Sequence, residues 1–87
     1  ITDLEDVVSE DETIEIYPNP TNGIVYIKAS EETINSITVS NMTGKVLVEK
    51  TVNADQAEID LSSYNKGIYL VKVVTENDSY IEKVVLK

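Results

Sequence analysis

The side chains of this sequence that could do chemistry are carboxylates, hydroxyls and amines, because its 87 residues include no histidine and no cysteine. Their absence excludes Ser-His and Cys-His nucleophile pairs, thiolate metal sites and disulfides. Carboxylates stand in pairs at Glu58 with Asp60 and at Glu31 with Glu32. For glycosidase-type catalysis such a pair must face each other across a substrate, with one pKa raised by burial. Because Glu58 and Asp60 fall on the hydrophilic face of an expected strand, we interpret them as solvated.

A lysine can replace histidine as a base when it is desolvated, which makes Ser62 or Ser63 with Lys66 a conceivable dyad. The surrounding sequence Ser-Ser-Tyr-Asn-Lys-Gly is typical of a polar loop, where the ammonium stays hydrated. Calcium loops of the Asp-x-Asx-x-Asx-Gly kind are absent from the sequence. Segments 53–55 and 77–78 could hold an ion weakly, but ordinary turn chemistry explains them. We therefore expect no enzymatic activity, no cofactor and no metal site.

Five tyrosines could form a platform for sugar rings if several of them lay coplanar on one exposed face. Tyr69 stands among valines, which favours a place in the core. Tyr17 precedes a proline turn, and we expect it to plug one end of the fold rather than to bind a ligand. Without tryptophan, the tyrosines alone are a weak indication of carbohydrate binding.

Charge and hydropathy restrict the partners. Sixteen acidic residues against seven lysines give a net charge of −9, and there is no arginine to make bidentate contacts with phosphate or guanine. We therefore expect no nucleic-acid partner. The longest apolar runs have four residues, far short of the roughly 20 that a transmembrane helix needs, so we expect no transmembrane segment.

The acidic residues are concentrated near the N-terminus, where the first fifteen positions hold seven of them and no lysine. We interpret residues 1–13 as an acidic linker or tail that a protease could reach. The sequence begins with Ile1 and shows neither an initiator methionine nor a signal segment, which indicates a piece of a longer protein.

Seven short segments of β-type alternation follow the acidic arm, with turn residues about every ten positions, a spacing typical of an antiparallel sandwich or barrel. They span residues 13–17, 24–29, 34–41, 45–52, 56–61, 67–75 and 79–86. The segment 67–75 is the most apolar, and we expect it to be a central strand. The segment 79–86 has two candidate inward faces, and a bulge could change its phase.

Alternation within the segments predicts which side chains point to the core. The inward residues are expected to be Ile37 and Val39; Val46 and Val48; Ala57, Ile59 and Leu61; and Tyr69, Val71 and Val73.

The most distinctive segment is Ile-Tyr-Pro-Asn-Pro-Thr-Asn-Gly at 16–23. Two prolines fix φ, and Asn22-Gly23 suits the positive φ angles of a tight turn, so we expect a rigid, exposed loop. With it the sequence resembles the C-terminal sorting domains of the type IX (Por) secretion system of Bacteroidetes. The segments 41–48, 59–61, 66–73 and 83–87 match further motifs of that family in order and spacing.

The resemblance implies that residues 14–87 form a seven-stranded immunoglobulin-like sandwich at the C-terminus of a larger cargo. Such a domain directs its passenger from the periplasm across the outer membrane to the cell surface or medium. Its implied partners are the translocon and a sortase that commonly removes it as the cargo is attached to the surface. The candidate recognition residues are Pro18, Asn19, Pro20, Thr21, Asn22, Gly23, Gly44, Lys45, Gly67, Tyr69, Lys83 and Lys87.

The glycines before strands and the terminal lysines also have ordinary structural explanations as turn residues and edge charges. The alternative function is an immunoglobulin-like accessory module that binds carbohydrate or mediates adhesion in a surface protein. A dimer formed through an open strand edge is a further possibility.

Overall fold

The computed structural model describes residues 14–87 and shows seven β-strands and no helix in that part of the chain. The acidic linker expected at residues 1–13 lies outside the described residues. The strands are Ile14–Tyr17 (β1), Ile24–Ala29 (β2), Ile34–Asn41 (β3), Val46–Ala54 (β4), Gln56–Asp60 (β5), Gly67–Thr75 (β6) and Ser79–Leu86 (β7).

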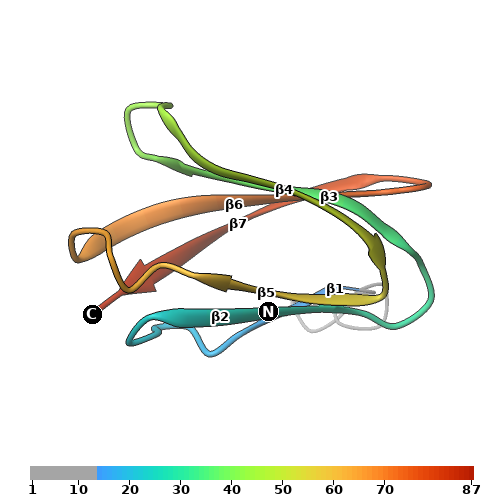
Figure 1. Ribbon diagram of the computed structural model, residues 1–87, viewed down its shortest axis with the longest axis horizontal. Coiled ribbons are helices and arrows are strands. Elements are labelled where there is room, and N and C mark those ends of the chain that lie inside the picture. The colour runs from blue at the N-terminus through green and yellow to red at the C-terminus, as the bar shows by residue number, and fades with distance from the viewer. Residues whose placement is uncertain (1–13) are drawn as a thin grey trace, which may run out of the picture.

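The strands form two antiparallel sheets that lie face to face (Figure 1). One has three strands in the order β1-β2-β5, and the other has four in the order β4-β3-β6-β7. This arrangement confirms the predicted all-β, seven-stranded antiparallel sandwich of immunoglobulin-like type. No helix within residues 14–87 is long and apolar enough to cross a membrane.

The core lies between the sheets and follows the alternation of the sequence. Ile37 and Val39 are fully buried, and so are Ile59 and Leu61 to within a few per cent. Strand β6 runs between β3 and β7, which confirms that it is an interior strand. Its inward side chains Tyr69, Val71 and Val73 are all buried, as expected.

The expectation for the start of β4 was wrong. Val46 is 50% exposed, whereas Leu47 and Val48 both pack against the core. The cause is an irregularity in the β3–β4 ladder, where Val39 pairs with Val48 but the next residue, Ser40, pairs with Val46. The extra residue at Leu47 interrupts the alternation, as a β-bulge does.

Strand β7 shows no such irregularity, because its pairing with β6 is continuous from Gly67↔Leu86 to Val74↔Ser79. The ambiguous last segment is therefore not re-phased by a bulge. Val84 and Leu86 are buried on its inward face. Glu82 lies on the same face of β7 as Val84 and Leu86, but its side chain is exposed. It lines an open pocket beside β1 at the edge of the sandwich.

Candidate functional site

Backbone pairing gathers several candidate residues at one end of the four-stranded sheet. Strand β3 ends at Asn41, which pairs with Tyr69 on β6, and Tyr69 pairs with Val84 on β7. Gly67, the first residue of β6, pairs with Leu86. The turn after β3, the start of β6 and the end of β7 therefore lie side by side, at the end of the molecule where the C-terminus is drawn (Figure 1).

The proline loop joins the same end. After pairing with β2 as far as Tyr17, the chain passes through two cis peptide bonds, Tyr17–Pro18 and Asn19–Pro20. It then crosses to the other sheet, where Thr21 forms a parallel bridge with Leu86. The loop at 18–23 thus connects the edges of the two sheets, and the structure brings it together with the terminal strand.

Four hydrogen bonds hold this loop against β7. The side chain of Asn19 donates from Nδ2 to the carbonyl of Lys83 at 2.8 Å and accepts at Oδ1 from the N–H of Val85 at 3.0 Å. The N–H of Thr21 donates to the carbonyl of Val85 at 2.8 Å, and the N–H of Lys87 donates to the carbonyl of Thr21 at 2.8 Å. We call residues 19–21 the strap, because they cover the outer edge of β7.

The loop is only partly exposed, which corrects the expectation of a wholly exposed segment. Pro18, Asn19, Pro20 and Asn22 are exposed, but Thr21 is 2% exposed and Gly23 is also buried. The Thr21 hydroxyl donates to the carbonyl of Ile24 at 2.7 Å and accepts from the N–H of Gly23 at 3.1 Å. The buried hydroxyl of Thr21 therefore fixes the turn that leads into β2 through these two hydrogen bonds.

The tight turn with positive φ expected at Asn22-Gly23 is absent, since the positive-φ glycines of residues 14–87 are Gly44 and Gly67. Glycine suits position 23 because space is short there instead. An added Cβ would lie 3.1 Å from the Cβ of Ser62, and the Gly23 carbonyl accepts a 2.7 Å hydrogen bond from the N–H of Leu61. The loop before β6 thus packs directly on the proline loop.

The turn at 42–45 is organised by one side chain. The Oδ1 atom of Asn41 accepts hydrogen bonds from the N–H of Thr43 (3.0 Å), the hydroxyl of Thr43 (2.7 Å) and the N–H of Lys45 (3.0 Å). Gly44 has φ 96°, a conformation that side chains with a Cβ rarely adopt. This turn fixes the backbone at Lys45, whose side chain is exposed.

Tyr69 is 6% exposed, which confirms its predicted place in the core. Its hydroxyl donates to the carbonyl of Asn65, and its ring lies 6.5 Å from that of Tyr64. The Tyr64 hydroxyl in turn donates to the carbonyl of Leu47 at 3.3 Å. These hydrogen bonds and the contact between the two rings therefore hold the loop between β5 and β6 in place. Gly67, with φ 154°, brings that loop into β6.

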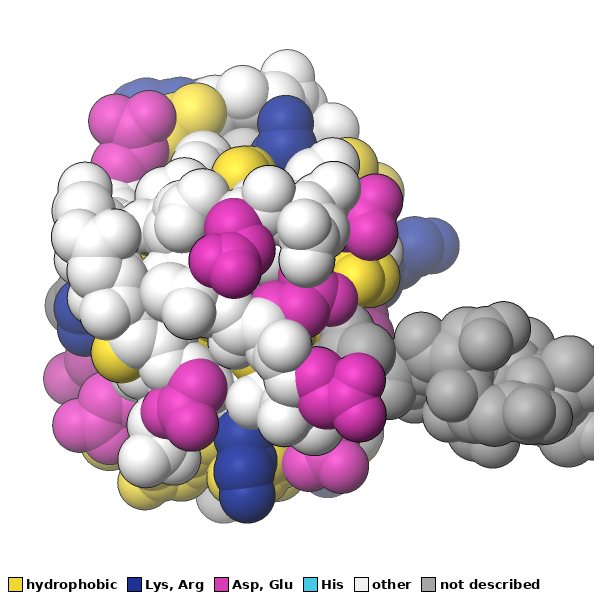
Figure 2. All heavy atoms as spheres, turned by 90° about the vertical axis from the view of Figure 1, so that its right-hand side faces the viewer, with side chains coloured by type: hydrophobic (Ala, Val, Ile, Leu, Met, Phe, Trp, Pro, Cys, Tyr) yellow, Lys and Arg dark blue, Asp and Glu magenta, His cyan; other side chains and the backbone are white. Residues whose placement is uncertain are grey.

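The loops at the two ends of the sandwich differ in charge. At the end just described they carry lysines and no carboxylate, namely Lys45, Lys66 and Lys87. The connections at the opposite end carry carboxylates and no lysine, namely Glu31, Glu32, Asp55, Glu76 and Asp78. Figure 2 looks at this opposite end, where acidic side chains are spread over the face. The loops at the two ends therefore differ in the sign of their charge, and Asp60, the last residue of β5, is a carboxylate beside the lysine-bearing loops.

One carboxylate of each pair that could do acid–base chemistry has structural partners. Asp60 accepts from the hydroxyl of Ser62 at 2.6 Å and from its N–H at 2.9 Å. These two bonds hold the pKa of Asp60 below its ordinary value of 3.8, the opposite of what a general acid needs. The hydroxyl of Ser62 is thus bonded to Asp60 and not to Lys66. Glu32 accepts from the hydroxyls of Thr75 and Tyr80.

Within residues 14–87, no group of three or more Asp or Glu side chains is arranged to hold a metal ion. The fold and this end of the sandwich define a small β-sandwich module with a polar surface at one end. A family model described as "Secretion system C-terminal sorting domain" matches residues 15–87, and the chain belongs to this family. No curated protein matches the chain.

Membership of this family makes the chain a C-terminal sorting signal of the type IX secretion system, which exports a passenger to the cell surface or the medium. The family consists of secretion-signal domains and is not a known enzyme family. The family match gives no support for the alternative of an accessory module in place of a sorting signal.

Proposed function

We propose that the translocon of the outer membrane binds the end of the sandwich that carries the strap and the lysine-bearing loops. The observation that carries this proposal is convergence: the candidate residues come from four segments of the sequence and meet on one surface through backbone pairing. A sandwich of this size does not require its distinctive motifs to share one end. A shared binding surface explains the arrangement.

The contact surface consists of the exposed candidates, which are Pro18, Asn19, Pro20, Asn22, Gly44, Lys45, Gly67, Lys83 and Lys87. Thr21, Gly23 and Tyr69 are buried and act by shaping the loops. The lysines at this end fit a partner with an acidic surface, since complementary charge speeds encounter and fixes orientation. The acidic opposite end would disfavour docking the wrong way round.

The domain acts as an address and not as a catalyst, and the acidic segment 1–13 serves as the tether to the passenger. The route runs through the periplasm, and a sortase removes the domain when the passenger is attached to the surface. The support for these steps is the family membership together with seven acids and no lysine in the first fifteen residues.

The test is an export assay. Residues 1–87 are fused behind a signal peptide and a fluorescent passenger in a Bacteroidetes host, where the passenger should reach the surface or medium and should stay in the periplasm of a translocon mutant. Retention of the unmutated fusion in the host with an intact translocon would contradict the sorting function itself.

The recognition surface is tested by Lys83→Ala with Lys87→Ala. Both side chains are exposed, and each lysine contributes only a backbone atom to its hydrogen bond with the strap. The matched control is Lys28→Ala with Lys72→Ala, which removes the same charge from exposed positions inside β2 and β6. Export should fall for the first pair and not for the second, with both melting temperatures near that of the parent. Equal export of the two pairs would place recognition elsewhere.

A further inference from the structure

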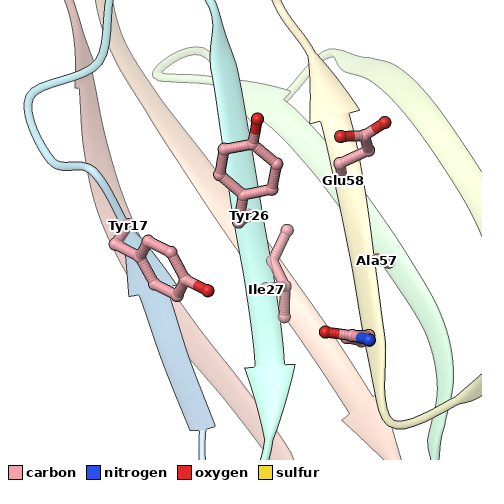
Figure 3. A pocket seen from close by; sticks show the side chains of 6 residues that line it. Tyr17, Tyr26, Ile27, Ala57 and Glu58 are labelled. Atoms are coloured by element: carbon pink, nitrogen blue, oxygen red, sulfur yellow. The ribbon is translucent and has the colours of Figure 1, made fainter.

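Two tyrosines lie side by side on the outer face of the three-stranded sheet. Tyr17 on β1 pairs with Tyr26 on β2, their ring centroids are 5.8 Å apart, and the ring planes differ by 30°. Tyr17 is 45% exposed and Tyr26 is 41% exposed. The expectation that Tyr17 plugs one end of the fold was therefore wrong. The two rings are adjacent and open on one face of the sheet (Figure 3), as a platform for a sugar ring requires.

Polar side chains from β5 flank the rings. Tyr26 pairs with Glu58 across the β2–β5 ladder, and the neighbouring position of β5 on the same face is Gln56. Figure 3 shows the Tyr26 ring between Tyr17 and Glu58. These residues line a pocket of about 300 Å³, at the lower end of the range of small-molecule sites. The carboxylate of Glu58 accepts hydrogen bonds, and the amide of Gln56 both donates and accepts them.

We propose that this face binds a neutral saccharide, with a pyranose ring lying on Tyr17 and Tyr26 and its hydroxyl groups bonded by Gln56 and Glu58. A pyranose has an apolar face of C–H groups and a rim of hydroxyls, so it matches a surface of exposed aromatic rings beside amide and carboxylate groups. This activity is additional to sorting and does not rest on it.

The surroundings argue against the two other kinds of occupant. An apolar protein surface would bury Glu58 without a hydrogen-bond donor, which is costly. A cationic ligand would be drawn to the rings and the carboxylate, but ammonium groups already stand nearby. Lys28 lies opposite Gln56 in the ladder, and the Nζ of Lys50 donates to the backbone carbonyl of Glu58 at 3.0 Å. A neutral ligand meets neither penalty.

The test is an NMR titration of the full 87-residue chain. The probes are hexasaccharides of β-1,4-linked glucose, α-1,4-linked glucose and β-1,4-linked xylose, with hexalysine as the cationic comparison. We expect saturable shifts of the ring protons of Tyr17 and Tyr26 with at least one saccharide, and none with hexalysine. The absence of ring shifts with all three saccharides would overturn the proposal, and so would binding of hexalysine in their place.

Variants separate stacking from general apolar contact. Tyr17→Leu and Tyr26→Leu should weaken saccharide binding about tenfold or more, whereas Tyr17→Phe should retain it, because the ring remains. Glu58→Ala should weaken binding, and its control, Glu49→Ala on β4 of the other sheet, should not. Circular dichroism checks that each variant is folded. If the leucine variants bind as tightly as the parent, the rings are not the platform and the proposal fails.

Discussion

The Oδ1 atom of Asn19 accepts a hydrogen bond from the N–H of Val85, a residue 66 positions further along the chain. Together with the bond from Nδ2 to the carbonyl of Lys83, it lets one side-chain amide replace a neighbouring strand at the edge of β7. An exposed edge strand is a template for unwanted pairing. Asn19 forms hydrogen bonds with two of the backbone groups at this edge, so these groups are paired within the domain. The residue that the sequence singles out as a recognition candidate is therefore also a structural one.

Replacing Asn19 should accordingly destabilise the domain. Asn19→Ala removes two hydrogen bonds, each worth about 1 kcal/mol, so the free energy of unfolding should fall by about 1–2 kcal/mol. In Asn19→Asp the acceptor for Val85 remains while the donor to Lys83 is lost, and the loss should be smaller. Urea denaturation followed by circular dichroism measures both. An unchanged midpoint for Asn19→Ala would show that the strap adds nothing to stability.

A charge in the core should unfold the sandwich. Val71 is 1% exposed, and Val71→Asp places a carboxylate where no partner is available, at a cost of about 4 kcal/mol or more. The control is Lys72→Asp, one position along on the exposed face, which should stay folded. Circular dichroism should show β structure for the parent and for Lys72→Asp, but not for Val71→Asp. A native spectrum for Val71→Asp would contradict the core assignment.

Acid should weaken the contribution of Asp60. Its pKa is lowered in the folded state by the hydroxyl and the N–H of Ser62, so its stabilising effect is present above pH 3.8 and disappears as the pH falls through the lowered value. The parent should be more stable than Asp60→Asn at neutral pH, and this difference should shrink in strong acid. Ser62→Ala should raise the pKa of Asp60, which NMR titration of the carboxyl measures. No change in that pKa would rule out the role of the hydroxyl.

The turn before β4 should not tolerate a side chain at Gly44. Nothing lies within 4 Å of an added Cβ there, so the penalty comes from φ alone. Gly44→Ala should lower the free energy of unfolding by about 1–2 kcal/mol. Asn22→Ala, an exposed loop position on the same end, serves as the control and should change it little. Thermal melts compare the two, and equal melting temperatures would contradict the strain argument.

Most of the fold could be predicted from the sequence, because a strand with one buried face needs alternating side chains. The alternation predicts that Ile37 and Val39 on β3, and Val71 and Val73 on β6, point to the core, and all four are buried. The start of β4 was misassigned because the bulge opposite Val39 and Ser40 shifts the pairing by one residue. A bulge depends on the partner strand, and the residues of β4 alone do not specify it.

The candidate site was only partly predictable. The proline loop, the turn at Gly44 and the terminal lysines stand out by composition, but their meeting at one end depends on the order of strands in two sheets. Thr21 looks like an exposed turn residue and is buried, because the chain changes sheets there. Tyr17 was misplaced because Ile16 packs against the core, so that alternation in β1 turns the next ring to the open face beside Tyr26.

The strap also determines how the domain bears mechanical load. Residues 19–21 run parallel to the end of β7, so a pull between Ile14 and Lys87 draws the two segments past each other in opposite directions. The four hydrogen bonds between them are then strained together and must break together, whereas a pull that peeled the segments apart would break them one at a time. The pairing of the strap with the end of β7 thus makes the domain a stiff coupling under tension along the chain.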